Sequence, residues 1–445
     1  MPWKHLVVCG CLFWPPLPAI AHPNDSIVPE RPKPTPYGFQ ISRVKDLQQR
    51  SVGPWDLDDG TGTGLPVADY LRVVQGRERE GGAYDTQLVE PLHDLGRAYQ
   101  AGGRHDEALA TFRRALHLNR INGGLYNSAQ LPLMNDMIDS YLVLGDLDAA
   151  DQLYDWRFRV QQQAHSPGQP EMQQAVSEYV DWQRQAYLQG ITGVTDEGFR
   201  RLLTIYEAHS AQIEQLEEAG DRGAAYREAL YNRLEVEYLI SQYDGEKVPA
   251  VQLNISGWGG TTDELATSTS IEAERFRQLR EYNLRNGINT ARRIVDLEDS
   301  AEQPDPVARA RARLAAGDWY QWWGLTARAR QNYEEAWAIF DGDESETTDP
   351  DDLFSRPVEL PDTRVFHPDG IAPSEDARAR AVVSLRVSRD GRAREIEVVE
   401  QEPPEDMGAR VVLYRLLRDV RFRPVVRNGQ TQSVAGVVRE YRYQY

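Results

Sequence analysis

The chain is 445 residues long, and 40% of its residues are apolar while 27% are charged. These proportions are typical of roughly two to four globular domains and exclude a largely disordered chain. Acidic residues outnumber basic ones by 69 to 50, which gives a formal net charge of −19 at pH 7. Because a negative surface repels phosphate groups, we expect no nucleic acid among the partners.

The first 21 residues have the pattern of a secretory signal peptide. A short polar start precedes an apolar run over residues 6–14, and Ala19-Ile20-Ala21 supplies an A-x-A cleavage site. The run is too short and too rich in proline to be a convincing membrane span. We therefore expect export to the periplasm with cleavage after Ala21. The alternatives are a lipid on Cys9 or Cys11, or an uncleaved inner-membrane anchor.

Cys9 and Cys11 are the two cysteines of the chain, and both lie within the expected signal. If the signal is removed, no thiol remains. Disulfides, thiolate metal sites and cysteine nucleophiles are then excluded, and the fold must rely on apolar packing.

Two segments have the composition of linkers. Residues 22–85 are rich in proline and glycine, which predicts an extended tether. The alternating glycines at 60–64 lack the preceding strand and the following Lys-Ser/Thr of a phosphate-binding loop. The acidic stretch at 341–352 lacks the mid-loop glycine and the closing glutamate of a calcium loop. We therefore expect a solvated acidic linker at 344–365.

Residues 86–343 have the period of amphipathic helices. One apolar face runs over 92–99, Gly102-Gly103 breaks the pattern, and a second apolar face follows. The layout returns around Gly145 and again around Gly324. In each copy a bulky aromatic residue precedes the glycine turn by four positions, and a small residue and a second aromatic follow it.

This spacing has a physical reason. Two closely crossing helices need a small residue where their backbones approach, and a large aromatic fills the gap to the next hairpin. The chain here resembles tetratricopeptide-repeat proteins, which implies a solenoid of stacked helical hairpins. The copy around Gly145 is degenerate and requires an insertion around 123–127, the registers between 170 and 300 stay open, and 251–270 is expected to be a long loop. The repeat positions are Leu95, Gly96, Tyr99, Ala108, Phe112, Ala115, Gly317, Tyr320, Ala329, Tyr333 and Ala336.

The last segment changes to the period of β-strands. In residues 379–387 every second residue is apolar and the residues between them are expected to face outward, which predicts a strand. Asp390-Gly391 favours a hairpin turn, and 393–399 are predicted to form the return strand. Helical period follows over 406–420, and 434–445 are predicted to form a final strand. The fold class is therefore mainly α, a tetratricopeptide-like solenoid followed by a small α+β domain with the order β-β-α-β.

This order of motifs over residues 366–445 resembles the C-terminal domain of TonB-type proteins. The resemblance is carried by Asp390, Gly391, Phe422, Pro424, Asn428 and Gly429. It implies a domain that offers a sheet edge to an extended partner peptide and couples inner-membrane energy to outer-membrane transport. Because the N-terminal apolar run is short and precedes a cleavage site, we expect partner docking rather than energy transduction.

No catalytic or metal-binding motif stands out. The eight histidines lack H-E-x-x-H spacing, and neither a G-x-S-x-G elbow nor a Walker A sequence occurs. Nothing singles out a carboxylate pair. The tryptophans at 319, 322, 323 and 337 are expected in the core rather than in a ligand platform. We therefore expect a non-catalytic protein without cofactor or metal, and a hydrolase in the 251–270 loop is the enzymatic alternative.

The leading hypothesis is a periplasmic protein–protein interaction adaptor with a helical groove and a docking sheet edge. Its partners would be proteins or peptides of the cell envelope, with an outer-membrane receptor or an edge-strand dimer as further options. The alternative is an atypical TonB-type energy transducer anchored by an uncleaved N-terminus. The positions expected to face the groove are Glu90, His93, Arg97 and Gln100 in the first clear repeat, and Arg311, Leu314, Asp318 and Gln321 in the last.

Overall fold

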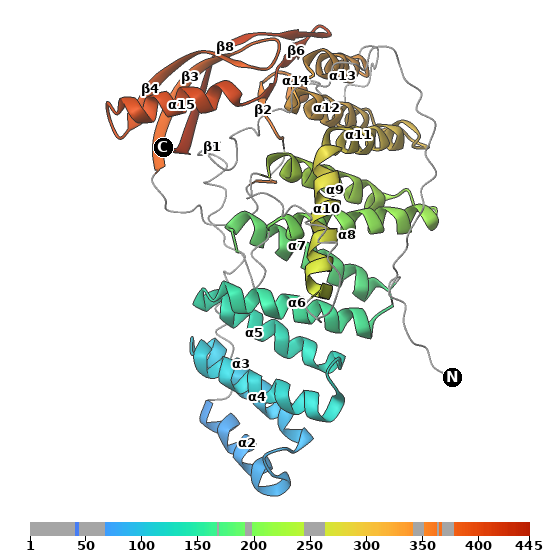
Figure 1. The fold of residues 1–445 in the computed structure, drawn as a ribbon, viewed down its shortest axis with the longest axis vertical. Coiled ribbons are helices and arrows are strands. Elements are labelled where there is room, and N and C mark those ends of the chain that lie inside the picture. The colour runs from blue at the N-terminus through green and yellow to red at the C-terminus, as the bar shows by residue number, and fades with distance from the viewer. Residues whose placement is uncertain are drawn as a thin grey trace. The chain divides into compact units, whose positions relative to one another are not determined.

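A stack of helix pairs is followed by an α+β region with an antiparallel sheet, which confirms the predicted fold class (Figure 1). The computed structural model describes residues 41–43, 67–166, 169–191, 198–243, 263–340, 351–362, 365–366 and 378–445. The expected signal peptide lies outside these residues. Among the described residues, no helix is both long and apolar enough to cross a membrane.

The helical region is an antiparallel array in which each helix packs on the next. The main pairs are α3 with α4, α5 with α6, α7 with α8, α9 with α11, and α12 with α13, while α10 also contacts α8. The helices are α2 (Val67–Gly81), α3 (Val89–Ala101), α4 (His105–Gly123), α5 (Leu131–Leu144), α6 (Leu147–Ala164), α7 (Pro170–Gln189), α8 (Gly198–Glu218), α9 (Ala224–Gln242), α10 (Asp263–Glu281), α11 (Asn283–Asp299), α12 (Pro306–Trp322) and α13 (Thr326–Ala338).

The second aromatic of the repeat, expected to fill the gap to the next hairpin, packs on a glycine of its own hairpin. A Cβ atom at Gly96 would lie 2.2 Å from the Phe112 ring, and one at Gly317 would lie 2.4 Å from the Tyr333 ring. Each glycine of α3 or α12 therefore seats an aromatic side chain of the paired helix. The remaining repeat positions are buried or half-buried: Leu95, Tyr99, Ala108, Ala115, Tyr320, Ala329 and Ala336.

The 42-residue spacing of the first two copies comes from a repeated junction. Asp85 and Asn127 accept hydrogen bonds from the backbone N–H groups of Gln87 and Ala129, respectively, both at 3.0 Å. Each opens a 3₁₀ turn, Thr86–Leu88 or Ser128–Gln130, just before α3 or α5. The predicted insertion at 123–127 is therefore a helix extension followed by a capped turn.

Three expected loop segments contain regular structure. The tether at 22–85 includes the strand β1 (Ile41–Arg43) and the helix α2, and α2 packs on α3. The final part of the expected loop at 251–270 belongs to α10. The acidic linker at 344–365 includes α14 (Asp351–Phe354) and β2 (Val358–Glu359). Composition failed to predict β1 and β2 because these short strands pair with β8 and β5, which are distant in sequence.

The C-terminal region has the expected β-β-α-β order with short additional strands. The large sheet has the strand order β1-β8-β3-β4, with β3 (Arg378–Val387), β4 (Ala393–Glu402) and β8 (Val434–Gln444) all antiparallel to their neighbours. The helix α15 (Met407–Asp419) connects β4 to β5 (Phe422–Arg423), which pairs with β2. A small hairpin of β6 (Val425–Arg427) and β7 (Gln430–Gln432) precedes β8.

Both predicted turns have left-handed backbone. Gly391 has a φ of 68°, and Asn428 and Gly429 have φ values of 52° and 70°. Asparagine and glycine tolerate this region, so the two-residue turn between β6 and β7 closes without strain.

The two edges of the large sheet differ. At one edge β4 is acidic and irregular: its register against β3 shifts twice, and Glu395 has a φ of 49°. Bulges and charges of this kind oppose the addition of another strand. At the other edge β8 accepts β1, with Ile41 opposite Tyr443 and Arg43 opposite Tyr441. The edge suited to strand pairing is therefore partly covered by the chain's own N-terminal segment.

Candidate functional site

Two predicted groove residues of the last repeat contact the chain's own C-terminal region. The Asp318 carboxylate on α12 accepts hydrogen bonds from the guanidinium of Arg423 on β5, one of them at 2.9 Å, and from the Tyr333 hydroxyl at 3.0 Å. Arg423 also donates to Asp362 at 2.8 Å. The Gln321 amide donates to the backbone carbonyl of Asp390 at 2.7 Å. These side chains therefore join the helical array to the sheet region.

This ion pair is almost fully buried, since Asp318 is 3% and Arg423 is 6% exposed. Burial by itself would lower the pKa of Arg423, but the carboxylates of Asp318 and Asp362 raise it above its ordinary value. The guanidinium stays charged, and its bidentate geometry fixes the orientation of β5 against α12.

The other two predicted groove residues of this repeat, Arg311 and Leu314, line a cavity of about 770 Å³. We call it the α9–α12 cavity, because α9 and α12 supply most of its walls and residues 353–362 supply another. Its apolar lining includes Tyr231, Leu234, Tyr238, Leu314 and Leu353. Its charged lining includes Arg227, Glu298, Arg311 and Arg356, together with the Asp318–Arg423–Asp362 cluster.

A second cavity, of about 800 Å³, lies between α7, α8 and α9, and we call it the α7–α9 cavity. The two cavities share Glu235 on α9. The α7–α9 cavity has an apolar lining of Met172, Val176, Val180, Ile205, Val236 and Leu239. Side-chain amides also line it: Gln162, Gln173, Gln212, Gln215 and Asn232.

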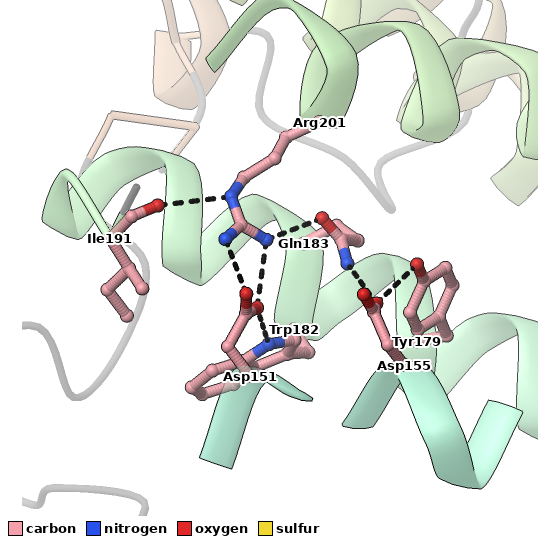
Figure 2. A network of polar contacts seen from close by, with 7 residues as sticks. All are labelled: Asp151, Asp155, Tyr179, Trp182, Gln183, Ile191 and Arg201. Carbon is pink, nitrogen blue, oxygen red and sulfur yellow. Dashed lines mark hydrogen bonds and ion pairs between the residues drawn. The ribbon is translucent and has the colours of Figure 1, made fainter. Parts of the chain in front are cut away.

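A buried polar network fixes the helices behind this second cavity (Figure 2). Arg201 on α8 donates to both carboxylate oxygens of Asp151 on α6, at 3.0 and 2.8 Å, and to the amide oxygen of Gln183 on α7 at 2.7 Å. Trp182 donates to Asp151 at 2.8 Å. A buried ion pair with all its partners present is typical of a structural joint, and this one sets the mutual register of α6, α7 and α8.

A neighbouring contact links this joint to the cavity wall. The Tyr179 hydroxyl on α7 donates to Asp155 on α6 at 2.8 Å, and Tyr179 itself lines the α7–α9 cavity (Figure 2). Burial raises the pKa of Asp155 and of Tyr179. The phenol therefore remains protonated and holds the wall in place at physiological pH.

The electrostatics of the α7–α9 cavity are mainly acidic. Arg184 on α7 contacts both Asp181, at 3.3 Å, and Glu235, at 3.2 Å. Glu228 at the rim is exposed. Burial lowers the pKa of His209 to about 4, so this lining imidazole is neutral at pH 7. The cavity thus combines an apolar floor, amide donors and acceptors, and a net negative charge.

The predicted groove residues of the first repeat are mostly engaged with the next helix pair. The His93 ring nitrogen lies 2.5 Å from an Asp136 carboxylate oxygen on α5, and Gln100 donates to the Asp136 carbonyl and the Ser140 hydroxyl at 3.0 and 3.1 Å. Arg97 lies 4.0 Å from the same carboxylate and is largely exposed, as is Glu90. These positions therefore connect α3 to α5.

The sequence predicted helical structure between 170 and 300, but it assigned no repeat register there and placed no site residue on α7, α8 or α9, which line the α7–α9 cavity. Two of the lining amides, Gln162 and Gln173, lie in the glutamine-rich stretches at 161–163 and 173–174, which were the usable signal.

The remaining sequence-based candidates have structural positions. Trp319 and Trp322 are buried against Tyr238, with ring centroids 4.9 and 5.1 Å away, as expected for core residues. Phe422 and Pro424 of the TonB-like motif are buried at the joint with α12. Within the residues that the structure describes, no group of three or more His, Cys, Asp or Glu side chains could hold a metal ion.

Comparisons with known proteins add the following findings. No protein-family profile matches the chain, and no curated protein matches it. Among solved structures, a Podosopora anserina protein described as a kinesin light chain with nearly identical TPR-like repeats is 11% identical, with a TM-score of 0.31, over 47% of this chain and 85% of its own. BtubC (BKLC) from P. vanneervenii is 14% identical, with a TM-score of 0.27, over 64% of this chain and 93% of its own.

Proposed function

We propose that the protein is a non-catalytic protein–protein interaction adaptor of the cell envelope. The observation that carries the proposal is the pair of cavities that share Glu235 along α7, α9 and α12. Each has room for several residues of an extended peptide, and Glu235 lines both. Apolar side chains alternating with amides suit an extended peptide, whose side chains seek apolar pockets and whose backbone seeks hydrogen bonds.

A peptide-selection experiment tests the proposal. Ala211 lines the α7–α9 cavity at an exposed position of α8, so Ala211→Trp should obstruct the cavity without disturbing the core. The matched control is Ala110→Trp, on an exposed position of α4. We expect immobilised wild type to enrich peptides from a random library that Ala110→Trp also binds and Ala211→Trp does not. If no enriched peptide depends on Ala211, the cavity is not the docking site.

The β8 edge is a second proposed docking surface, in line with the resemblance of this region to TonB-type domains. Its support is the edge of β8 that already accepts the short strand β1, whereas β4 at the opposite edge is bulged and acidic. A longer extended segment from an envelope partner, or from a second copy, would pair with β8 by the same backbone hydrogen bonds.

The N-terminal residue of the mature protein distinguishes a periplasmic adaptor from the transducer alternative. Mass spectrometry of the protein isolated from its native envelope should find a chain that begins at His22, as cleavage after Ala21 requires. A chain that begins at Met1 and remains in the inner membrane would instead favour an atypical TonB-type transducer.

A further inference from the structure

Several side chains at the end of the predicted acidic linker, and Phe366 at the start of the predicted C-terminal domain, are buried like core residues. Phe354, Leu360 and Val365 are at most 1% exposed, and Phe366 is 5% exposed. Phe354 packs against the rings of Trp337 and Phe340 at the α13 end of the array, with centroid distances of 5.2 and 6.2 Å. A chain segment with this degree of burial behaves as a bound ligand rather than as a spacer.

The same segment lines both cavities. Leu353, Val358 and Asp362 form part of the wall of the α9–α12 cavity, and Val365 lines the α7–α9 cavity. Phe366 stacks on Trp322 of α12 with a centroid distance of 6.3 Å and an interplanar angle of 21°. Val365 and Phe366 belong to the same apolar cluster as Val236 and Leu239, which line the α7–α9 cavity from α9.

We propose that Val365-Phe366 is an internal competitor for the α7–α9 cavity, which binds an extended partner peptide with an aromatic anchor and basic residues. The inference rests on the proposed function and specifies its partner. Phe366 stacks on Trp322, which indicates that the partner peptide places an aromatic side chain there. Val365 lines the cavity, which indicates an apolar residue just before that aromatic residue. The partner peptide continues along the cavity beyond Val365 and takes over the position of Phe366.

Charge complementarity determines the basic character of the partner. The charged lining of the α7–α9 cavity is Asp181, Glu228 and Glu235 against Arg184, which already contacts two of these acids. His209 does not offset this charge, since it is neutral at pH 7. Lysine or arginine side chains that flank the aromatic anchor would therefore enter a lining with a net negative charge, in which Glu228 is exposed at the rim.

The internal segment also sets the affinity. A competitor in the same chain has a high effective concentration, so the part of the site that Val365-Phe366 covers is available only in the fraction of molecules in which this segment has dissociated. Weakening this segment should raise the apparent affinity for a peptide added in solution, whereas filling the cavity should abolish binding.

The experiment uses the full chain and a fluorescent peptide that copies residues 357–368, together with a version carrying lysine in place of Thr363 and His367, which flank Arg364-Val365-Phe366 in the sequence. We expect Val365→Ala/Phe366→Ala to bind the lysine version at least about tenfold more tightly than wild type does. Adding Ala211→Trp should remove that binding, whereas adding Ala110→Trp should not. The lysine version should also bind more tightly than the unaltered copy.

A second measurement avoids dependence on the stability of the double variant. In wild type, a saturating lysine-containing peptide should increase hydrogen exchange of the backbone amides of residues 365–366. If wild type and the double variant bind equally and Ala211→Trp blocks both, the internal competitor is wrong but the cavity is still a peptide site. If Ala211→Trp has no effect on any selected peptide, the proposed function fails as well.

Discussion

Arg423 shows how one residue can connect two modules. It lies on β5 between Phe422 and Pro424, and its side chain is held by Asp318 of the helical array and Asp362 of the intervening segment. Removing one member of a buried ion pair leaves an uncompensated charge, which costs more than the pair contributes when it is intact.

Arg423→Met should therefore lower the free energy of unfolding by about 3 kcal/mol or more. Arg427→Met is the matched control, because Arg427 is exposed and should change stability by less than about 0.5 kcal/mol. Urea unfolding measures the change in the free energy of unfolding for both variants. Combining Arg423→Met with Asp318→Leu should recover part of the loss, and strictly additive effects would contradict coupling between the two residues.

Glu237 gives the fold a pH dependence. It is fully buried on α9, where Asn283 of α11 donates to its carboxylate. Burial raises its pKa from 4.5 to about 8, although Arg233 and Asn283 act in the opposite direction. The folded protein thus keeps this proton up to about pH 8, whereas the unfolded chain loses it near pH 4.5.

The free energy of unfolding should therefore fall as the pH rises from about 4.5 to 8, by an amount on the order of a few kcal/mol. Glu237→Gln stays neutral throughout and should remove this component of the pH dependence. Urea midpoints between pH 5 and 8.5 measure it, with Glu281→Gln at an exposed position of α10 as the control. Parallel curves for wild type and Glu237→Gln would argue against a buried proton.

At the scale of elements, close helix crossings depend on glycine at two repeat positions. Gly96 of α3 has no room for a methyl group, because its Cβ would lie 2.2 Å from the ring of the fully buried Phe112. Gly76 of α2 is also in a helix but has nothing within 4 Å of a Cβ position. The same substitution should therefore have opposite effects at the two sites.

Gly96→Ala should destabilise the protein by about 1–3 kcal/mol, since the Phe112 ring or the α3 backbone must move. Gly76→Ala should stabilise it by up to about 1 kcal/mol, because alanine loses less conformational freedom in a helix interior. Thermal unfolding by circular dichroism measures both changes. A stabilising Gly96→Ala would mean that α3 and α4 do not approach this closely.

At the scale of the whole molecule, residues 34–445 form one compact unit, and the array and sheet region share an apolar cluster. The cluster joins Trp319 and Trp322 of α12 to Leu360 and to sheet residues such as Tyr441. Such shared burial should hold the two regions together without the covalent connection between them.

A protease site inserted at residue 345 tests this expectation. After cleavage, the fragments 1–345 and 346–445 should elute together in size-exclusion chromatography. The Arg423→Met variant should separate at lower protein concentration than the Arg427→Met control, because only the former loses the buried ion pair. Immediate separation of the wild-type fragments would indicate two independent modules.

Much of the secondary structure could be predicted because its causes are local. Glycine turns after 102, 145 and 324, the apolar face of each helix and the Asp390-Gly391 and Asn428-Gly429 turns depend on residues close in sequence. The elements that composition missed include the short β1, α14 and β2, and also the 15-residue helix α2. β1 pairs with β8 and β2 with β5, strands that are far away in the chain.

The candidate site also has a part that follows from local sequence and a part that depends on distant contacts. Helical period alone places four groove candidates on one side of a helix: Arg311, Leu314, Asp318 and Gln321. The contacts of Asp318 with Arg423 and of Gln321 with Asp390, 105 and 69 residues further along the chain, are visible only in the folded protein. Burial and charge pairing depend on which distant surfaces meet, and helix period carries no information about them.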